Sequence, residues 1–378
     1  MRVLTRAGRS ALAVGAVLVI VGLVAGYSTL IGVGVAFLAV VGFAVILVSR
    51  PPSVTVEREV RPTRVMAEQP AEVELVIQNQ GRRTTPSGVA LERFGDIALP
   101  VTVPAVPPGE SVSVVTALPT DRRGVYNVGP LLINRSDPLA LARRGELARS
   151  VAELRVHPKI HEVDPYPSGL TRDLDGPNSG EAPEGGVAFQ NLREYVVGDD
   201  LRLIHWRSSA KSGQLMVRHN VDSHQPRSLI LLDTRPDTYS ADSFEDAVRV
   251  TASIATASLR RRFPFKLRTT AGFVIERTTP AQLLDELAAL EAGPGDFENM
   301  LHAATQDLGG YSLSIITGSA PVSDLISVGP LRSRFDNITI VRTGIGDASE
   351  SVQLPGALLI NVGTSVDFAR AWNRRLRR

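Results

Sequence analysis

The stretch Ser228-Leu229-Ile230-Leu231-Leu232-Asp233 decides the class of fold. Four aliphatic residues followed by an acid are typical of a strand that is buried on both faces of a parallel sheet. Further strands are predicted at Phe265-Thr269, Phe273-Glu276, Ser312-Thr317, Ile338-Arg342 and Ala357-Val362. Because helical patterns lie between several of these strands, we expect an α/β doubly wound C-terminal domain. Its ligand site would lie at the carboxyl ends of the strands.

Two helices of this domain have recognisable beginnings. Ser243 is followed three residues later by Asp246, which predicts a capping box. Thr279 precedes a proline at the first helical position and Gln282, which is a second capping-box pattern. Both patterns indicate where helices start between the predicted strands.

A polar stretch comes before the Ser228-Asp233 strand and reads Leu192-Arg193-Glu194-Tyr195-Val196-Val197-Gly198-Asp199-Asp200-Leu201-Arg202-Leu203-Ile204-His205-Trp206. Asp199 or Asp200 is placed to cap a short helix that begins at Leu201. On that helix Arg202 and Trp206 are four residues apart and share a face, so the guanidinium would lie against the indole. A turn over residues 208 to 213 and a returning strand over 214 to 219 complete the prediction.

The charges of this stretch alternate in sign, so we expect them to pair internally and to brace the α/β domain while presenting a docking surface. The residues assigned to this surface are Arg193, Tyr195, Gly198, Asp199, Arg202, Trp206 and Lys211. Replacing Arg202 or Trp206 would then destabilise the α/β domain as well as weaken partner binding.

Two other functions of the same stretch are open. Asp199, His205 and Ser209 include the three side-chain types of a hydrolase triad, although no nucleophile elbow surrounds them. Tyr195 and Trp206 among arginines are typical of single-stranded nucleic-acid binding. The interleaved acids cancel much of that charge, and the formal net charge of the chain is only +2. We therefore expect no nucleic-acid partner.

The N-terminal region carries no charged residue from Ser10 to Val48, and it divides at residues 26–29. Each half has about the ~20 residues that cross ~30 Å of hydrocarbon as a helix. Arginines precede the first half and follow the second, so the positive-inside rule places both ends in the cytoplasm. A cleaved signal peptide is the alternative, against which the second apolar run argues. We expect a cell-membrane protein with two helices and with cytoplasmic N- and C-termini.

Short runs of alternating apolar and polar residues in 51–160 predict antiparallel strands and an all-β domain of the Ig-like sandwich kind. Residues 161–186 are rich in Pro, Gly, Asp and Asn and predict a loop linker. The expected organisation is a transmembrane helical hairpin at 1–50, the β-sandwich, the linker, and the polar stretch with the α/β domain at 187–378. The chain has no cysteine, which excludes disulfides and thiolate chemistry.

Two segments of the β-rich region look like turns at strand ends, Arg122-Arg123-Gly124-Val125-Tyr126 and Ser136-Asp137-Pro138-Leu139. A docking edge is the functional alternative for them.

The stretch from Leu192 to Trp206, with Ser209-Ala210-Lys211 after it, resembles the signature of the "domain of unknown function 58" family. The apolar hairpin, the β-rich region with Arg-Gly-x-Tyr and Asp-Pro-Leu, and the α/β domain agree with this family over essentially the whole chain. The family has no assigned enzyme activity. The resemblance implies association with MoxR-type AAA+ ATPases, often with transglutaminase-like membrane proteins, and a von Willebrand A-like C-terminal region.

In von Willebrand A-like domains, the place of Asp233 carries Asp-x-Ser-x-Ser, which helps to bind a divalent metal through oxygen ligands. This chain has Arg235 and Asp237 in place of the two serines. Arg235 would oppose a metal and pair with Asp233 or Asp237 instead. The resemblance therefore implies a degenerate metal site, and we expect no metal and no other cofactor, with a divalent metal as the alternative.

The expected function is that of a membrane-anchored, non-enzymatic scaffold or adaptor whose cytoplasmic domains bind a protein partner. The resemblance makes a MoxR-type AAA+ ATPase the candidate partner. Because no Gly-Lys-Ser/Thr loop is present, we expect no ATP hydrolysis by the chain itself. The alternative is a hydrolase or a divalent-metal-dependent enzyme that uses Asp233 or the set Asp199, His205 and Ser209.

Overall fold

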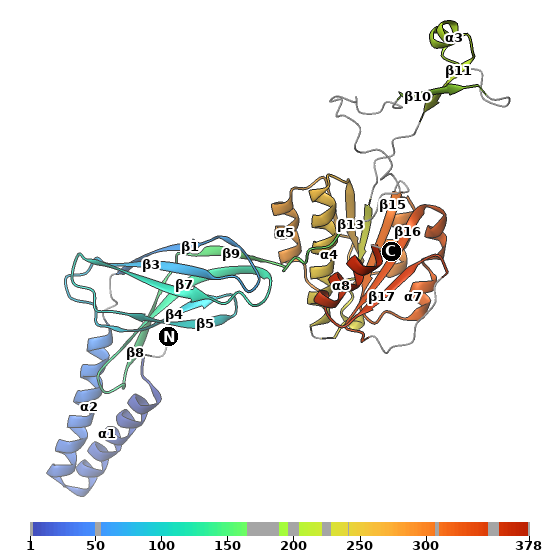
Figure 1. The fold of residues 1–378 in the computed structure, drawn as a ribbon. Coiled ribbons are helices and arrows are strands. Elements are labelled where there is room, and N and C mark those ends of the chain that lie inside the picture. The colour runs from blue at the N-terminus through green and yellow to red at the C-terminus, as the bar shows by residue number, and fades with distance from the viewer. Residues whose placement is uncertain are drawn as a thin grey trace. The chain divides into compact units, whose positions relative to one another are not determined.

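A computed structural model describes residues 3–49, 54–164, 189–195, 204–220, 228–240, 242–306, 310–346 and 355–376 (Figure 1). The chain forms two compact units. The first contains Met1–Lys159 and Leu284–Leu290, and the second contains Ile160–Leu283 and Glu291–Arg378. The first unit holds the apolar helices and a β-sandwich, and the second holds the α/β sheet.

The two N-terminal helices are α1 (Arg6–Ala25) and α2 (Ser28–Ser49), and both are long and apolar enough to cross a membrane. Thr5 caps α1, because its hydroxyl accepts a hydrogen bond from the Gly8 amide at 3.1 Å. Gly26 ends the helix at φ 72°, a left-handed conformation that glycine adopts without strain. The chain therefore reverses at the predicted uncharged turn.

Glycines let α1 and α2 approach closely. A Cβ atom on Gly34 would lie 2.8 Å from the Gly15 carbonyl oxygen, and one on Gly22 would lie 2.7 Å from the Ile31 side chain. Close contact of this kind holds helices together in lipid, where no hydrophobic force acts between them. The two helices thus form one packed hairpin.

The all-β region is a sandwich of two sheets. One sheet has the order β1 (Val54–Arg61), β3 (Ala71–Asn79), β6 (Ser111–Leu118). The other has the order β2 (Arg64–Met66), β9 (Ala152–His157), β7 (Gly124–Ser136), β4 (Gly88–Phe94), β5 (Ile97–Val103), with β8 (Arg143–Ala148) paired to β7. All pairs are antiparallel except β2 with β9.

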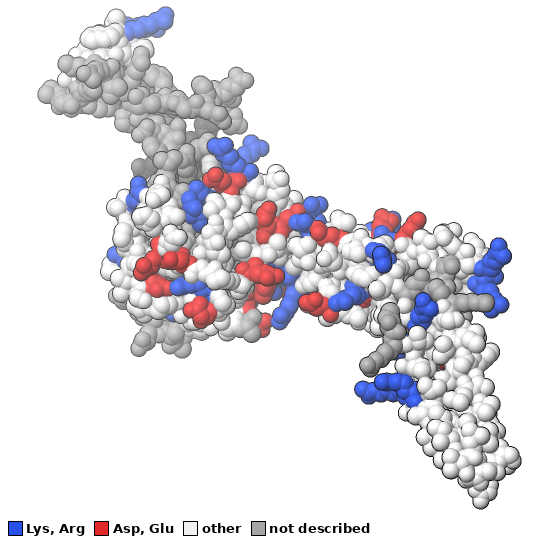
Figure 2. All heavy atoms as spheres, turned by 180° about the vertical axis from the view of Figure 1, so that it is seen from behind, with Lys and Arg blue, Asp and Glu red and all other residues white. Residues whose placement is uncertain are grey.

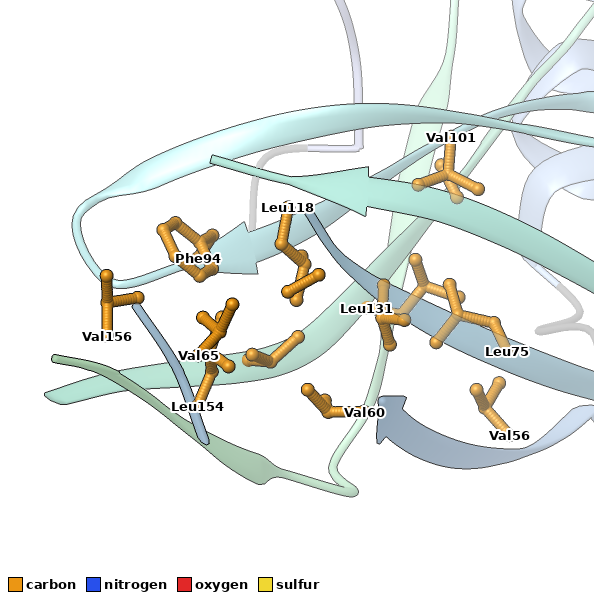
Figure 3. Packing of buried hydrophobic residues seen from close by; sticks show 14 of the residues in the cluster. Val56, Val60, Val65, Leu75, Phe94, Val101, Leu118, Leu131, Leu154 and Val156 are labelled. Atoms are coloured by element: carbon orange, nitrogen blue, oxygen red, sulfur yellow. The ribbon is translucent and has the colours of Figure 1, made fainter. Parts of the chain in front are cut away.

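The core of the sandwich follows from the two-residue period of its strands. Alternate residues of β3 point inward, so Val73, Leu75 and Ile77 are buried. They pack in one cluster with residues of the facing sheet such as Leu131 and Leu154 (Figure 3). Alternation of apolar and polar residues thus predicted these strands correctly.

The same interior contains an ion pair that the alternation of apolar and polar residues does not predict. Arg58 lies at an inward position of β1, and Glu92 lies on β4 of the other sheet. Nε of Arg58 donates to Oε1 of Glu92 at 2.7 Å, and Nη2 donates to Oε2 at 2.9 Å. The two side chains are 1% and 0% exposed. The pair therefore links the two sheets inside the core.

The Arg122–Tyr126 segment lies at a strand end, as predicted, because β7 begins at Gly124, and the structure explains its residues. The Tyr126 hydroxyl donates to the Arg122 carbonyl at 3.0 Å, and its ring stacks on Phe94 with 4.5 Å between centroids. A Cβ atom on Gly124 would lie 2.9 Å from the Tyr126 ring. This arrangement resembles the tyrosine corner of immunoglobulin-like sandwiches, where the tyrosine stands near the start of a strand.

The α/β unit is built on a six-stranded sheet with the order β14 (Val274–Glu276), β13 (Phe265–Thr269), β12 (Ser228–Leu232), β15 (Gly310–Thr317), β16 (Phe335–Thr343), β17 (Leu358–Val362). Only β14 is antiparallel to its neighbour. All six strands lie where the apolar runs predicted them. The strand order reverses between β12 and β15.

Helices cover both faces of this sheet. One face carries α4 (Ser243–Arg260) and α8 (Ser365–Leu376), which also contact each other. The other face buries residues of α6 (Phe297–Gln306) and α7 (Val322–Ile326). The short helices η2 (Pro236–Thr238) and η3 (Gly329–Ser333) lie in the connections. Because β12 is covered on both faces, its four aliphatic residues are all buried.

Both helices begin where they were predicted, but only one of the two predicted capping boxes is present. Helix α5 (Pro280–Ala289) has its capping box, since the Gln282 side chain accepts from the Thr279 amide at 3.1 Å and the Gln282 amide donates to Thr279 Oγ1 at 3.3 Å. The capping box at Ser243 is wrong. Asp246 instead accepts a hydrogen bond at 3.0 Å from the Ser365 amide, at the beginning of α8.

The first residues of the predicted linker run along α4 and α8. The His161 amide donates to Ser253 Oγ at 2.9 Å, and Trp372 Nε1 donates to the Asp164 carbonyl at 2.8 Å. The rest of the linker, residues 165–186, lies outside the described residues.

Candidate functional site

The point where the strand order reverses brings two loops together at the carboxyl ends of β12 and β15. Asp233 follows β12 directly and is fully buried, and its amide donates to the Ile316 carbonyl of β15 at 2.9 Å. Open α/β sheets bind their ligands in the crevice at this kind of reversal. The prediction that Asp233 lies at such an edge is therefore correct.

Arg235 donates hydrogen bonds to both carboxylate oxygens of Asp233. Nε of Arg235 donates to Oδ1 at 3.0 Å, and Nη2 donates to Oδ2 at 2.8 Å, which is the fork geometry of a strong pair. The Thr317 hydroxyl, at the end of β15, donates to the same Oδ2 at 2.9 Å. The buried charge of Asp233 is thus neutralised within the chain.

The same guanidinium reaches a second acid. Nη2 of Arg235 donates to Oδ2 of Asp324 on α7 at 2.8 Å, and its Cζ atom lies 5.1 Å from the ring centroid of Phe297 on α6. The hydrogen bonds that Arg235 donates to Asp233, and then the one that it donates to Asp324, raise the pKa of Arg235 above its ordinary value, although burial opposes them. Arg235 therefore stays cationic.

The expected partner of Arg235 was Asp233 or Asp237, and the structure selects Asp233. Asp237 is exposed in η2. Asp324 was missed, because it lies 89 residues along the chain and no local pattern connects it with Arg235. We call Asp233, Arg235, Thr317 and Asp324 the switch-point cluster.

The loops around the switch-point cluster are held closely together. The Tyr239 hydroxyl donates to the Asp233 carbonyl at 2.5 Å, and the Ser319 amide donates to the Thr238 carbonyl at 2.6 Å. A Cβ atom on Gly318 would lie 2.0 Å from that carbonyl oxygen, so only glycine fits between the loops.

Tyr239 gives the α/β unit a predictable response to alkali. Burial, reinforced by the negative charge of Asp233, raises the pKa of Tyr239 well above the ordinary value of 10.0, with Arg235 opposing. A phenol with a raised pKa keeps its proton in the folded state where the unfolded chain loses it. Its stabilisation is therefore complete below about pH 10 and is lost as the pH rises further, at up to about 1.4 kcal/mol per pH unit.

We expect Tyr239→Phe to remove this part of the alkaline loss. Equilibrium unfolding of the wild-type and variant proteins between about pH 9 and 11 measures it. Equal slopes of unfolding free energy against pH in the two proteins would contradict the assignment.

The polar stretch before β12 forms a strand pair with a helix between. Strand β10 (Phe189–Glu194) pairs with β11 (Met216–Asn220), and α3 is Trp206–Ser212. Leu201 itself lies outside the described residues, but the predicted helix from Leu201 through Trp206 is wrong at Ile204, which forms a β-bridge with Val217, and at His205, whose amide donates to the Met216 carbonyl at 2.7 Å. The cap is His205, whose Nδ1 accepts from the Ser208 amide at 3.2 Å, and not an aspartate.

The predicted turn over residues 208 to 213 is also wrong, since α3 occupies most of it and Gly213 ends the helix at φ 74°. Ser209 is buried, and its hydroxyl donates to the His205 carbonyl at 3.1 Å and accepts from the Met216 amide at 2.8 Å. These bonds attach the helix to β11. They are main-chain contacts and do not form the hydroxyl-to-imidazole contact of a triad.

The structure places part of the expected docking set. Arg193 lies in β10 opposite Val217, and the Tyr195 amide donates to the Leu215 carbonyl at 2.8 Å. Lys211 is exposed on α3. Gly198, Asp199 and Arg202 lie outside the described residues.

Trp206 does not brace a core. Its side chain is 67% exposed, which argues against the expected brace and predicts only a small effect of Trp206→Ala on the stability of the α/β unit. An exposed tryptophan contributes little to the folded core, since its indole has not left water.

Comparison with known proteins identifies this part of the chain. Residues 191–264 match the family described as "Protein of unknown function DUF58". After this match, we call residues 191–264 the DUF58 segment. The DUF58 segment includes α3, β11, β12 and α4, and with them Trp206, Asp233 and Arg235. Thr317 and Asp324 of the switch-point cluster lie beyond it.

A Bacillus subtilis protein, YeaD, described as uncharacterised, is 28% identical over 142 residues. The match covers 36% of this chain and 34% of YeaD, so the chain aligns with about a third of that relative.

Among solved structures, the CARDB domain of a Pyrococcus furiosus protein is 19% identical, with 28% of this chain and 93% of that chain covered and a TM-score of 0.23. The putative ApaA protein from Bordetella pertussis is 14% identical, with 28% and 96% covered and a TM-score of 0.22. A common fold cannot be inferred at such scores. The β-sandwich therefore rests on its strand pairing.

Proposed function

We propose that the protein is a membrane-anchored, non-enzymatic adaptor whose DUF58 segment binds a protein partner. Helices α1 and α2 supply the anchor, with both termini in the cytoplasm. The family resemblance supplies the partner class, a MoxR-type AAA+ ATPase, together with a second membrane partner of the transglutaminase-like kind. The sheet order, with β12 and β15 at the reversal, supports a von Willebrand A-like arrangement for the domain.

The exposure of Trp206 carries the docking proposal. The indole is 67% exposed at the start of α3, and Arg207 and Lys211 are exposed on the same helix. Tryptophan and arginine are the residues most enriched at the energetic centres of protein interfaces. A large apolar side chain left in water beside cations is therefore the feature that a partner would cover.

The switch-point cluster supports a non-enzymatic function. Both oxygens of Asp233 already accept hydrogen bonds from Arg235, so the usual ligand position of an α/β sheet holds a cation of the chain itself. We propose that this cluster stabilises the loops.

A divalent-metal-dependent enzyme is the second candidate. One nitrogen of Arg235 bonds Oδ2 of both Asp233 and Asp324, and displacement of the guanidinium would leave two carboxylates side by side. Turnover that Asp233→Ala abolishes would favour this candidate over the adaptor.

Replacing Trp206 with alanine tests the adaptor. We expect the amount of ATPase that co-purifies from detergent under nucleotide-trapping conditions to fall at least about tenfold, as for an interface anchor. Quantitative mass spectrometry of the purified complex measures it. The melting temperature should stay unchanged, because the side chain is exposed.

The matched control is Ile326→Ala, whose side chain is 62% exposed on α7 and should leave capture unchanged. Full capture by the Trp206→Ala protein would show that α3 is not the docking element. If no ATPase is enriched with the wild-type protein, the partner class is wrong.

A further inference from the structure

The loop that joins β7 to β8 contacts the beginning of the apolar hairpin. We call residues 137–142 the 137–142 loop. The Thr5 amide donates to the Leu141 carbonyl at 3.0 Å, and the Thr5 hydroxyl donates to the Ala140 carbonyl at 2.7 Å. On the other side of the loop, the Arg143 amide donates to the Val3 carbonyl at 2.8 Å. The loop is therefore bonded to the residues that start α1.

The loop and the start of β8 also contact the end of α2. Nη1 of Arg144 donates to the Ser49 carbonyl at 2.6 Å. Ala142 is fully buried in a cluster with Ala44 and Val48 of α2. A Cβ atom on Gly8 would lie 2.0 Å from the Leu141 carbonyl oxygen, so α1 passes directly beneath the loop. The open end of the helical hairpin is thus packed against one edge of the sandwich.

The loop is preorganised by Asp137. This buried carboxylate accepts hydrogen bonds from the Leu139 amide at 2.9 Å and from the Ala142 amide at 2.6 Å. These bonds hold the tip of the loop in one conformation. Leu139, at the tip, is left 63% exposed. Because a rigid turn keeps this leucine exposed, we infer that it contacts an apolar environment outside the chain.

Apart from the buried Asp137, the charged residues closest to this leucine in the sequence are basic. Residues 3–9 and 138–145 contain arginines and no acid. Arg6 and Arg9 are exposed on α1, and Arg143 and Arg144 are exposed beside the loop. On the face drawn in Figure 2, basic side chains gather where the uncharged helical hairpin meets the sandwich. The surface is therefore complementary to anions.

The lengths of α1 and α2 indicate the depth of this surface in the membrane. Helices of 20 and 22 residues match the ~30 Å hydrocarbon layer, so the first turn of α1 and the last turn of α2 would lie at the headgroups. The 137–142 loop is hydrogen-bonded to the start of α1 and packs against the end of α2, so it would lie at the same depth. An exposed leucine among arginines is the composition of segments that bind the membrane interface.

We propose that the 137–142 loop, with Arg6, Arg9 and Arg143, is a binding site for anionic phospholipid headgroups, and that Leu139 inserts at the boundary of the acyl chains. This proposal rests on the membrane anchor proposed above. The β-sandwich would then be held against the bilayer by a rigid contact.

Single cysteines test the site in the full-length protein, because the chain has none of its own. An environment-sensitive fluorophore is attached at Leu139→Cys, and the protein is reconstituted into nanodiscs of phosphatidylcholine with or without phosphatidylglycerol. Spin-labelled lipids of each headgroup serve as quenchers. Val17→Cys, 57% exposed in the middle of α1, reports membrane insertion. Ile97→Cys, 49% exposed at the turn between β4 and β5, is the control on the same sandwich.

We expect quenching at positions 17 and 139 and none at position 97. Phosphatidylglycerol carrying the spin label should quench position 139 more than phosphatidylcholine does. We expect Arg9→Gln and Arg143→Gln each to lower the preference of position 139 for phosphatidylglycerol over phosphatidylcholine by about fivefold. One basic residue near an anionic surface contributes an effect of this size.

Each other outcome overturns a defined statement. Quenching at position 17 without quenching at position 139 would disprove the lipid site and leave the anchor intact. Equal quenching of position 139 by both headgroups would disprove the selectivity for anionic lipid. No quenching at position 17 would disprove the anchor and the lipid site together.

Discussion

Replacing Arg58 with methionine is expected to lower the free energy of unfolding of the β-sandwich by about 3 kcal/mol or more. The change leaves Glu92, which is fully buried, without the guanidinium that bonds both of its oxygens. A buried carboxylate without its partner costs more than the pair contributes, because it has lost water and gained nothing in return. Hydrogen exchange of the β3 amides in detergent, at increasing denaturant, measures the loss.

Arg61→Met is the matched control for this prediction. Arg61 lies on the same strand, but its side chain is 66% exposed and its pair with Glu59 is on the surface. We expect no measurable change in the free energy of unfolding. Adding Glu92→Leu to Arg58→Met should recover much of the stability, since the unpaired charge is then gone. If the double variant is as unstable as the single one, packing and not charge explains the loss.

Replacing Arg235 with alanine should destabilise the α/β unit by about 3 kcal/mol. The reason is again a buried acid, since Asp233 is fully buried and keeps only the Thr317 hydroxyl and weaker main-chain and threonine contacts. Trp372 reports the unfolding, because it is buried in α8 against Phe368, with 5.2 Å between ring centroids. Trp206, the other tryptophan, is exposed already and should change little.

Arg332→Ala, at an exposed arginine of the same unit, is the control and should change the stability by less than about 0.5 kcal/mol. The double variant Arg235→Ala with Asp233→Asn should lose less unfolding free energy than the sum of the losses in the two single variants, because the two groups share one hydrogen-bond network. Strict additivity would mean that Arg235 acts through contacts other than Asp233.

The sequence alone determined the elements whose signals are local. The uncharged run from Ser10 to Val48 indicated the apolar hairpin, and the aliphatic run Leu229–Leu232 indicated the central strand. The capping box of Thr279 and Gln282 is complete within four residues, and the structure has it. Period and capping patterns depend on neighbours in the chain, so they can be read without the fold.

Predictions failed where a distant segment competed for the same group. The helix expected from Leu201 begins at Trp206, because β11 takes the backbone of Ile204 and His205. Asp246 does not close its capping box, because the buried Ser365 amide at the start of α8 offers a partner 119 residues away. Local propensity is a weak preference that one tertiary hydrogen bond reverses.

Tertiary structure alone decided the partners of buried charges. The sequence placed Asp233 at the carboxyl end of a strand and set Arg235 beside it. Thr317 and Asp324 join this cluster only through the fold. Arg58 and Glu92 likewise meet only because the two sheets of the sandwich face each other. A buried charge is stable only with a partner, but burial alone does not determine which residue that partner is. Only the folded chain brings the two together.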